Sequence, residues 1–219
     1  MDVIYLNGGS GVRAELGYPK QFARIAGKPI LIYGLETLNQ VEGIDNIIIP
    51  SSDKEKTISI LQQYNIEKYI VIDNGKTRQL SVNEALRLVT TKHVLIMEAV
   101  RPFCSIDLIK KVMSIDYDFV TPRDKMKATV ICDWGKTVDR DKCGMVQMPQ
   151  KYKTSLLKTS HINARAKQFY DYSDDVELVV CNSLSKPQVI EGEEFNIKIT
   201  TPLDLRIAEG IYEYYNNRE

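Results

Sequence analysis

The sequence predicts an α/β protein with a doubly wound, mainly parallel sheet. Short apolar runs alternate with amphipathic stretches, and several of these runs are apolar throughout rather than at every second residue. Continuous apolar runs are typical of parallel strands that helices cover on both faces. A chain of 219 residues suits one large domain of this kind. We therefore expect a single Rossmann-like domain over residues 1–219.

Apolar runs and helical spacing give the individual elements. Five runs are expected to form strands: Val3–Leu6, Asn46–Ile49, Tyr69–Ile72, His93–Met97 and Phe119–Thr121. Between them, apolar residues recur at helical spacing in four stretches: Pro29–Leu38, Ser52–Tyr64, Asn83–Val89 and Ile106–Met113. Ser105 is expected as the N-cap of the last of these helices. Ligands of such sheets bind beyond the carboxyl ends of the strands, so the loops after the strands are where we expect a site.

Residues 122–150 interrupt the alternation. They read as two extended runs joined by Asp133-Trp134-Gly135, which is typical of a β-hairpin. We therefore expect an arm at about residues 122–145 that projects from the domain.

The C-terminal third returns to regular elements. Asp174-Asp175 indicates the start of a helix. Two further stretches, Pro187–Ile190 and Phe195–Ile199, are expected as final strands. Thr201 then caps a last helix, with Pro202 at its first position.

Composition favours a protein that acts on small molecules. Lysine plus arginine number 29, as do aspartate plus glutamate, so the formal net charge is zero. Proteins that bind nucleic acid or membrane surfaces are usually basic, so we expect neither partner. No stretch approaches the roughly 18 apolar residues of a membrane helix, and no signal-peptide pattern is visible. The four cysteines contain no CxxC pair, which favours reduced thiols and a cytoplasmic protein.

The loop after the first strand is rich in glycine. In the stretch Gly8-Gly9-Ser10-Gly11, the three glycines let the backbone approach a ligand closely. The backbone N–H groups can then point at the ligand, as in phosphate-binding loops. Pro19 interrupts the next segment, so Arg13 and Lys20 can fold back over bound phosphates. Cleavage of a triphosphate needs such cations, because negative charge grows on the leaving pyrophosphate. The alternatives are a tight strand-to-helix turn and a solvated pair of cations.

Other nucleotide-binding motifs fit less well. Gly9-x-Gly11-x-x-Ala14 matches the dinucleotide pattern, but the stretch from Gly27 to Tyr33 offers no acid for a ribose hydroxyl. The sequence contains no G-x-x-x-x-G-K-[ST] motif and no H-x-G-H motif. Its two histidines, His93 and His161, are expected to be structural.

A set of short motifs recurs in one order along nearly the whole chain. The motifs are Gly9–Arg13, Pro19–Phe22, Gly27–Leu31, Gly75–Val82, Ala99–Phe103, Thr137–Arg140, Met148–Gln150 and Asn196–Leu205. Together they resemble the cytidylyltransferase family that makes CDP-methylerythritol or CDP-ribitol from CTP. The resemblance implies a sheet of the nucleotide-diphospho-sugar transferase type. It also implies transfer of CMP to the phosphate of a small polyol phosphate, with release of pyrophosphate.

The resemblance assigns roles residue by residue. The catalytic cations would be Arg13, Lys20, Arg140 and Lys198. The nucleotide-binding residues would be Leu6, Asn7, Gly8, Gly9, Ser10, Gly11, Gly75, Arg78 and Ser81, with Gly75 and Ser81 against the cytosine. The acceptor-binding residues would be Glu98, Arg101, Lys125 and Met148. Mg²⁺ bound to the CTP phosphates would be the cofactor, with Glu98 as a candidate ligand. The arm would cross to a partner subunit, so that Arg140 acts in trans within a homodimer.

Four features depart from the family's pattern. Asn7-Gly8-Gly9 stands where the family usually begins A-A-G or A-G-G, which changes the cradle little because its backbone does the binding. Glu98 stands where the family has aspartate, and Lys125 and Met148 stand where it has threonine. We hypothesise that CTP is kept and the acceptor altered, with surface-polymer synthesis as one setting and isoprenoid synthesis as the other. The alternative is an ordinary acceptor, with Lys125 on a solvated face of the arm. Two further alternatives are a non-catalytic nucleotide-binding relative and a dinucleotide dehydrogenase.

Overall fold

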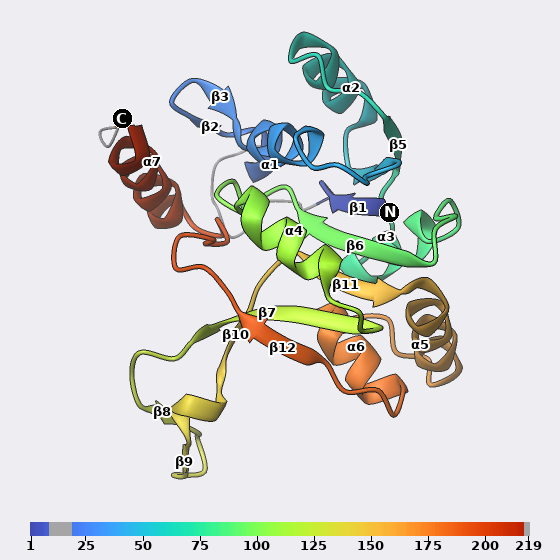
Figure 1. Ribbon diagram of the computed structural model, residues 1–219, viewed down its shortest axis with the longest axis vertical. Helices are drawn as coiled ribbons and strands as arrows, with labels where there is room; N and C mark the ends of the chain where they lie inside the picture. Colours follow the sequence, from blue (N-terminus) through green and yellow to red (C-terminus); the bar gives the residue numbers. More distant parts are fainter. Residues whose placement is uncertain (9–18, 217–219) are drawn as a thin grey trace.

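The computed structural model describes residues 1–8 and 19–216, and its centre is a twisted sheet (Figure 1). Seven strands lie in the order β10-β7-β11-β6-β1-β4-β5, and β12 also pairs with β7. The strands are β1 (Asp2–Leu6), β4 (Ile47–Ser51), β5 (Tyr69–Asp73), β6 (His93–Glu98), β7 (Phe119–Lys125), β10 (Gly144–Val146), β11 (Gln150–Lys153) and β12 (Gln188–Glu191). Strands β6, β1, β4 and β5 are parallel, whereas β11 runs antiparallel to both β6 and β7. The mainly parallel sheet that the sequence predicts is therefore confirmed.

Helices cover both faces of this sheet. The helices are α1 (Ile30–Asn39), α2 (Lys54–Gln63), α3 (Arg78–Ala85), α4 (Ile106–Ser114), α5 (Thr154–Ala166), α6 (Asp175–Asn182) and α7 (Pro202–Asn216). Two short 3₁₀ turns, η2 (Lys20–Phe22) and η3 (Arg140–Lys142), lie in the connections. None of the helices in the described ranges is long and apolar enough to cross a membrane.

Alternation along β1 shows how the two faces are filled. Val3 and Tyr5 join a core cluster that also contains Leu31 of α1. The residue between them, Ile4, joins a second cluster with Val82 of α3. Helices α1, α2 and α4 contribute to the first cluster, and α3, α5 and α6 to the second. Successive strand residues point to opposite faces, so a strand covered on both sides is apolar throughout.

Most of the predicted elements are confirmed. Four of the five central strands lie within two residues of their predicted bounds. The fifth, β7, continues to Lys125, because its last three residues pair with β10 at the base of the arm. The Ser105 hydroxyl caps α4 by accepting a hydrogen bond from the Leu108 N–H at 3.0 Å, as predicted. The Asp174 carboxylate caps α6 by accepting a hydrogen bond from the Val176 N–H at 2.7 Å.

Two predictions were wrong. The third helix was expected over Asn83–Val89, but α3 begins at Arg78, because the Thr77 hydroxyl accepts a hydrogen bond from the Leu80 N–H. The expected strand over Phe195–Ile199 does not form. Its residues make local turn bonds instead, such as that from the Ile197 N–H to the Phe195 carbonyl.

The predicted hairpin is confirmed. It consists of β8 (Val130–Ile131) and β9 (Thr137–Val138), which pair antiparallel around a turn that contains Gly135. Gly135 has φ +79°, a conformation that favours glycine. Figure 1 shows this arm extending away from the sheet and its helices. Trp134 at its tip is 75% exposed.

Candidate active site

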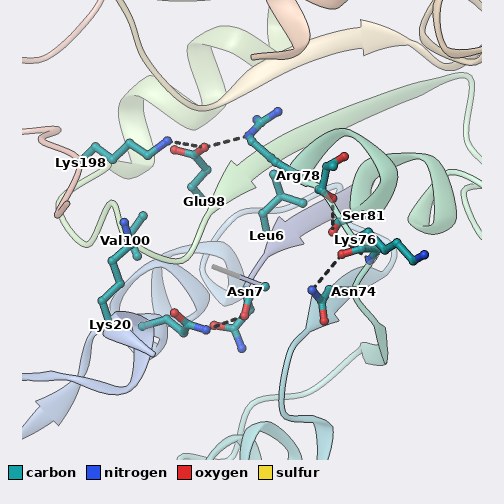
Figure 2. Close-up of a pocket in the computed structure, with 14 residues that line it drawn as sticks. Leu6, Asn7, Lys20, Asn74, Lys76, Arg78, Ser81, Glu98, Val100 and Lys198 are labelled. Carbon is teal, nitrogen blue, oxygen red and sulfur yellow. Dashed lines mark hydrogen bonds and ion pairs between the residues drawn. The ribbon is translucent and has the colours of Figure 1, made fainter. Parts of the chain in front are cut away.

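A cavity of about 360 Å³ lies where β1 and β6 end. The sheet changes winding direction between these two strands, since the chain proceeds from β1 outward to β4 and β5 and then returns to β6. Parallel sheets bind ligands at such a point. The lining residues are Leu6, Asn7, Gly8, Lys20, Gln21, Asn74, Gly75, Lys76, Thr77, Arg78, Ser81, Glu98, Val100 and Lys198. Most of them are drawn in Figure 2 with their labels.

Asn7 fixes the end of β1. Its side-chain amide donates hydrogen bonds to Thr57 Oγ1 at 3.0 Å and to Ser51 Oγ at 3.3 Å. Its carbonyl accepts a hydrogen bond of 2.8 Å from Gln21 Nε2. Gln21 lies in η2 beside Lys20, so this bond ties the 3₁₀ turn to the strand and holds Lys20 at the cavity. Sequence reasoning missed the role of Gln21, although Gln21 lies within the Pro19–Phe22 motif.

Gly75 and Ser81, both predicted to contact the cytosine, lie together at the cavity. The Ser81 hydroxyl accepts a hydrogen bond from the Gly75 N–H at 3.0 Å and donates one to the Thr77 carbonyl at 2.9 Å. This closes the β5–α3 loop on itself against the cavity. A Cβ atom on Gly75 would lie 2.6 Å from the carbonyl carbon of Leu80, so the loop has no room for a side chain there.

Gly75→Ala is expected to raise the KM for the nucleotide by at least about tenfold, because the loop must open to admit the methyl group. Gly210→Ala in α7 is the matched control, since a Cβ atom there meets nothing within 4 Å. Steady-state kinetics on both variants checks this. An unchanged nucleotide KM in Gly75→Ala would show that the tight loop is not needed for binding.

Glu98 gathers three cations at the end of β6. Its Oε1 atom lies 2.8 Å from Lys198 Nζ and 3.2 Å from Arg78 Nε, and its Oε2 atom lies 3.4 Å from Arg101 Nε. Figure 2 shows Lys198 and Arg78 reaching Glu98 from different elements. Burial alone would raise the pKa of Glu98, but the charges of Arg78, Lys198 and Arg101 outweigh it and lower the pKa to about 2. Glu98 is therefore ionised at neutral pH.

Arg101 differs from the other two cations. It is buried, and its Nη1 atom donates a hydrogen bond of 2.7 Å to the Asn196 carbonyl. The Ile199 N–H also bonds the Val100 carbonyl at 2.9 Å. These bonds attach the irregular segment before α7 to the end of β6, and so they place Lys198 at the cavity.

The residues around Glu98 do not fit a protein-held magnesium site. Both carboxylate oxygens already face cations, and Mg²⁺ needs several free oxygen ligands. No group of three or more metal-ligating side chains occurs within residues 1–8 and 19–216. Glu98 is thus better described as a partner of cations than as a metal ligand.

The other predicted site residues lie apart from this cavity or outside the described residues. Arg13, Gly9, Ser10 and Gly11 lie outside the described residues. Lys125 is exposed at the base of the arm, 3.7 Å from Glu191. Arg140 is exposed in η3 of the arm.

Met148 has a different environment from the predicted one. It was expected to face the acceptor, but it is 1% exposed and packs in the apolar cluster of Phe119 and Tyr152. Its main chain is used instead, because its carbonyl accepts a hydrogen bond from Asn196 Nδ2 at 2.6 Å. The structure therefore gives no basis for an acceptor contact by the Met148 side chain.

A doubly wound sheet with a lysine-lined cavity at its switch point defines a nucleotide-binding α/β protein. The family model of 2-C-methyl-D-erythritol 4-phosphate cytidylyltransferase, IspD, matches residues 1–214. The chain belongs to this family.

Individual relatives agree with the family match. The cytidylyltransferase of that name from Azobacteroides pseudotrichonymphae is 33% identical over 96% of this chain and 98% of its own. The one from Geobacillus thermodenitrificans is 31% identical over 96% of both chains. Among solved structures, 4-diphosphocytidyl-2C-methyl-D-erythritol synthase from Anaerococcus prevotii has a TM-score of 0.84 at 28% identity, covering 97% of this chain and 95% of its own. These matches favour the cytidylyltransferase interpretation over the dinucleotide-binding one.

Proposed function

We propose that the protein transfers CMP from CTP to the phosphate of 2-C-methyl-D-erythritol 4-phosphate and releases pyrophosphate. The observation that carries this proposal is one cavity that combines the Gly75–Ser81 loop with Lys20 and Lys198. The loop suits a small base, and the two lysines suit two phosphate groups. The named activity of the relatives supplies the particular substrates.

The reaction needs positioning and charge more than covalent catalysis. An oxygen of the acceptor phosphate attacks the α-phosphorus of CTP, and the bond from this phosphorus to the oxygen that bridges it to the β-phosphorus breaks. Pyrophosphate leaves with that oxygen and the electron pair. Lys20 stabilises the growing negative charge, and Lys198 holds the acceptor phosphate. Mg²⁺ belongs to this proposal only as part of the substrate, bound by the phosphates of CTP.

The ordinary acceptor of the family is favoured over an altered one. Lys125 would have to meet an additional anionic group of an altered acceptor, but its ammonium is exposed and faces Glu191. The relatives from Azobacteroides pseudotrichonymphae, Geobacillus thermodenitrificans and Geobacillus kaustophilus are all named as methylerythritol-phosphate cytidylyltransferases. We therefore propose isoprenoid synthesis as the setting rather than the synthesis of a surface polymer.

Turnover of a panel of acceptors tests this function. Pyrophosphate release is measured with CTP and Mg²⁺ against 2-C-methyl-D-erythritol 4-phosphate, ribitol 5-phosphate and glycerol phosphate. We expect kcat/KM to be highest for the methylerythritol phosphate. Binding of CTP with no turnover of any acceptor would instead favour the non-catalytic relative.

We also propose that the arm joins two copies of the chain and that Arg140 acts in the partner's site. Ile131 and Trp134 support this, because both are large apolar residues exposed on the arm.

We further propose that the protein acts in the cytoplasm. All four cysteines lie in the described ranges as free thiols, which is typical of a reducing compartment.

A mixing experiment tests action in trans. Arg140→Ala and Lys20→Ala are each expected to be inactive, because each lacks one cation of every site. Randomly mixed subunits would form heterodimers with one complete site, so activity should return to roughly one quarter of that of the wild type. No recovery after subunit exchange, with exchange verified by mass-tagged subunits, would contradict a site shared between subunits.

A further inference from the structure

Three consecutive residues at the start of α3 are held by the connection between α5 and α6 and by the first residue of α6. Thr77 Oγ1 donates a hydrogen bond to the Tyr170 carbonyl at 2.7 Å. The Gln79 side chain donates to the Phe169 carbonyl at 3.3 Å and accepts from the Tyr172 N–H at 3.1 Å. The residue between them, Arg78, faces Asp175 at the start of α6. The cavity-lining turn of α3 is therefore fixed from outside the cavity.

Arg78 forms a bridge between two buried carboxylates. Its Nη1 atom lies 2.8 Å from Asp175 Oδ2, and its Nε atom lies 3.2 Å from Glu98 Oε1. The same Oε1 atom pairs with Lys198 Nζ at 2.8 Å. A continuous line of charges thus runs from Asp175 through Arg78 and Glu98 to Lys198, although Asp175 itself does not line the cavity.

One oxygen of Glu98, Oε1, couples the position of Arg78 to that of Lys198. Arg78 and Lys198 both pair with Oε1 of Glu98, so a change in the position of the guanidinium alters the pairing of the ammonium. Asp175 holds the outer end of the guanidinium and limits how far it can approach Glu98. Without that anchor, Arg78 would turn further toward Oε1 and displace Lys198 from it.

We propose that Asp175 is a positioning residue for the acceptor phosphate: it anchors Arg78, and through Glu98 it sets where Lys198 presents its ammonium group. This assignment rests on the proposed function, in which Lys198 holds that phosphate.

The burial of the Asp175 carboxylate indicates that it does more than stabilise the folded state. Asp175 is 1% exposed, and burial raises its pKa more than the charge of Arg78 lowers it. The folded state therefore disfavours the negative charge of Asp175. An asparagine of the same size would avoid that penalty, and the buried Arg78 guanidinium would keep Glu98 as its carboxylate partner. The contact of the Asp175 carboxylate with Arg78 offsets part of this penalty.

Asp175→Asn is the test, with Asp2→Asn as the matched control. Asp2 is also a buried carboxylate, but it lies at the other end of β1 and accepts bonds from Thr90 and Asn46. We expect Asp175→Asn to fold and to raise the acceptor KM by about tenfold, with less than about a threefold change in the KM for CTP. Asp2→Asn should leave both KM values unchanged. A misfolded Asp175→Asn, or equal shifts in both KM values, would overturn the assignment.

A double-mutant cycle shows whether the effect passes through Lys198. In a Lys198→Ala background, Asp175→Asn should change the acceptor KM by less than about twofold, because the group it positions is gone. The same tenfold change in both backgrounds would contradict the proposed route.

A measurement without substrates separates this inference from the proposed function. The ammonium protons of Lys198 should exchange with water at least several-fold faster in Asp175→Asn than in the wild type, as seen by ¹⁵N-detected NMR. Asp2→Asn should show no change. If the wild type turned over no acceptor, the proposed function would fail, and ammonium exchange alone would then decide the positioning role. Equal exchange rates in Asp175→Asn and the wild type would overturn it.

Discussion

Lys20→Ala is expected to lower kcat/KM by about a hundred- to a thousand-fold, the range seen when one group that stabilises transition-state charge is removed. Lys20 is 8% exposed and lines the cavity from η2, which Gln21 ties to Asn7. A cation with so little access to water acts on bound phosphates with little screening. Its loss should therefore affect the rate more than nucleotide binding.

An exposed lysine provides the control for this prediction. Lys110 lies on the outer face of α4, and Lys110→Ala should leave kcat/KM within about twofold. Kinetics on both variants, with far-UV circular dichroism to confirm folding, checks the difference. A folded Lys20→Ala protein that retained a third of the wild-type kcat/KM would remove Lys20 from the mechanism.

Glu98→Gln is expected to lower the free energy of unfolding at pH 7 by about 3 kcal/mol, because it leaves buried cations without their carboxylate. The pKa of Glu98 is lowered to about 2 from an ordinary value of 4.5. A lowered carboxylate pKa stabilises the folded state fully above the ordinary value. That contribution is lost as the pH falls from about 4.5 toward 2. The difference between wild type and variant should therefore shrink over this range.

Urea unfolding at pH 7 and at pH 3 measures this difference. Glu84→Gln is the control, because Glu84 pairs with Arg87 on the surface and such pairs contribute little. Its effect should stay within about 0.5 kcal/mol. A Glu98→Gln protein as stable as the wild type at pH 7 would mean that the three cations find other partners.

The sequence predicted the sheet well, because buried parallel strands leave a simple signal. Continuous apolar runs marked each central strand, and the glycine and lysine motifs marked the cavity that forms where β1 and β6 end. Phe195–Ile199 alternates apolar and polar residues, as a half-buried strand does, and its prediction as a strand was wrong. Its course is set by Asn196, which bonds the Met148 main chain and receives a bond from Arg101, contacts that no local pattern reveals.

The charged network behind the cavity could not be predicted either. Arg78 and Asp175 are far apart in the sequence, and Asp175 looked like an ordinary helix start. Only the fold, in which α3, β6 and α6 share one apolar cluster, brings its carboxylate to Arg78. Met148 was misplaced for a related reason, since its motif leads into the buried strand β11 and its side chain packs in the core. Motifs thus identified the groups at the cavity, but not those that hold them.

Isotope transfer tests the central claim most directly. The acceptor 2-C-methyl-D-erythritol 4-phosphate is prepared with ¹⁸O in the three non-ester oxygens of its phosphate and incubated with CTP, Mg²⁺ and the protein. If the acceptor phosphate attacks the α-phosphorus, mass spectrometry should find all the label in a cytidine diphosphate ester of methylerythritol, and none in the pyrophosphate. Label in the pyrophosphate, or no such ester, would contradict the proposed transfer.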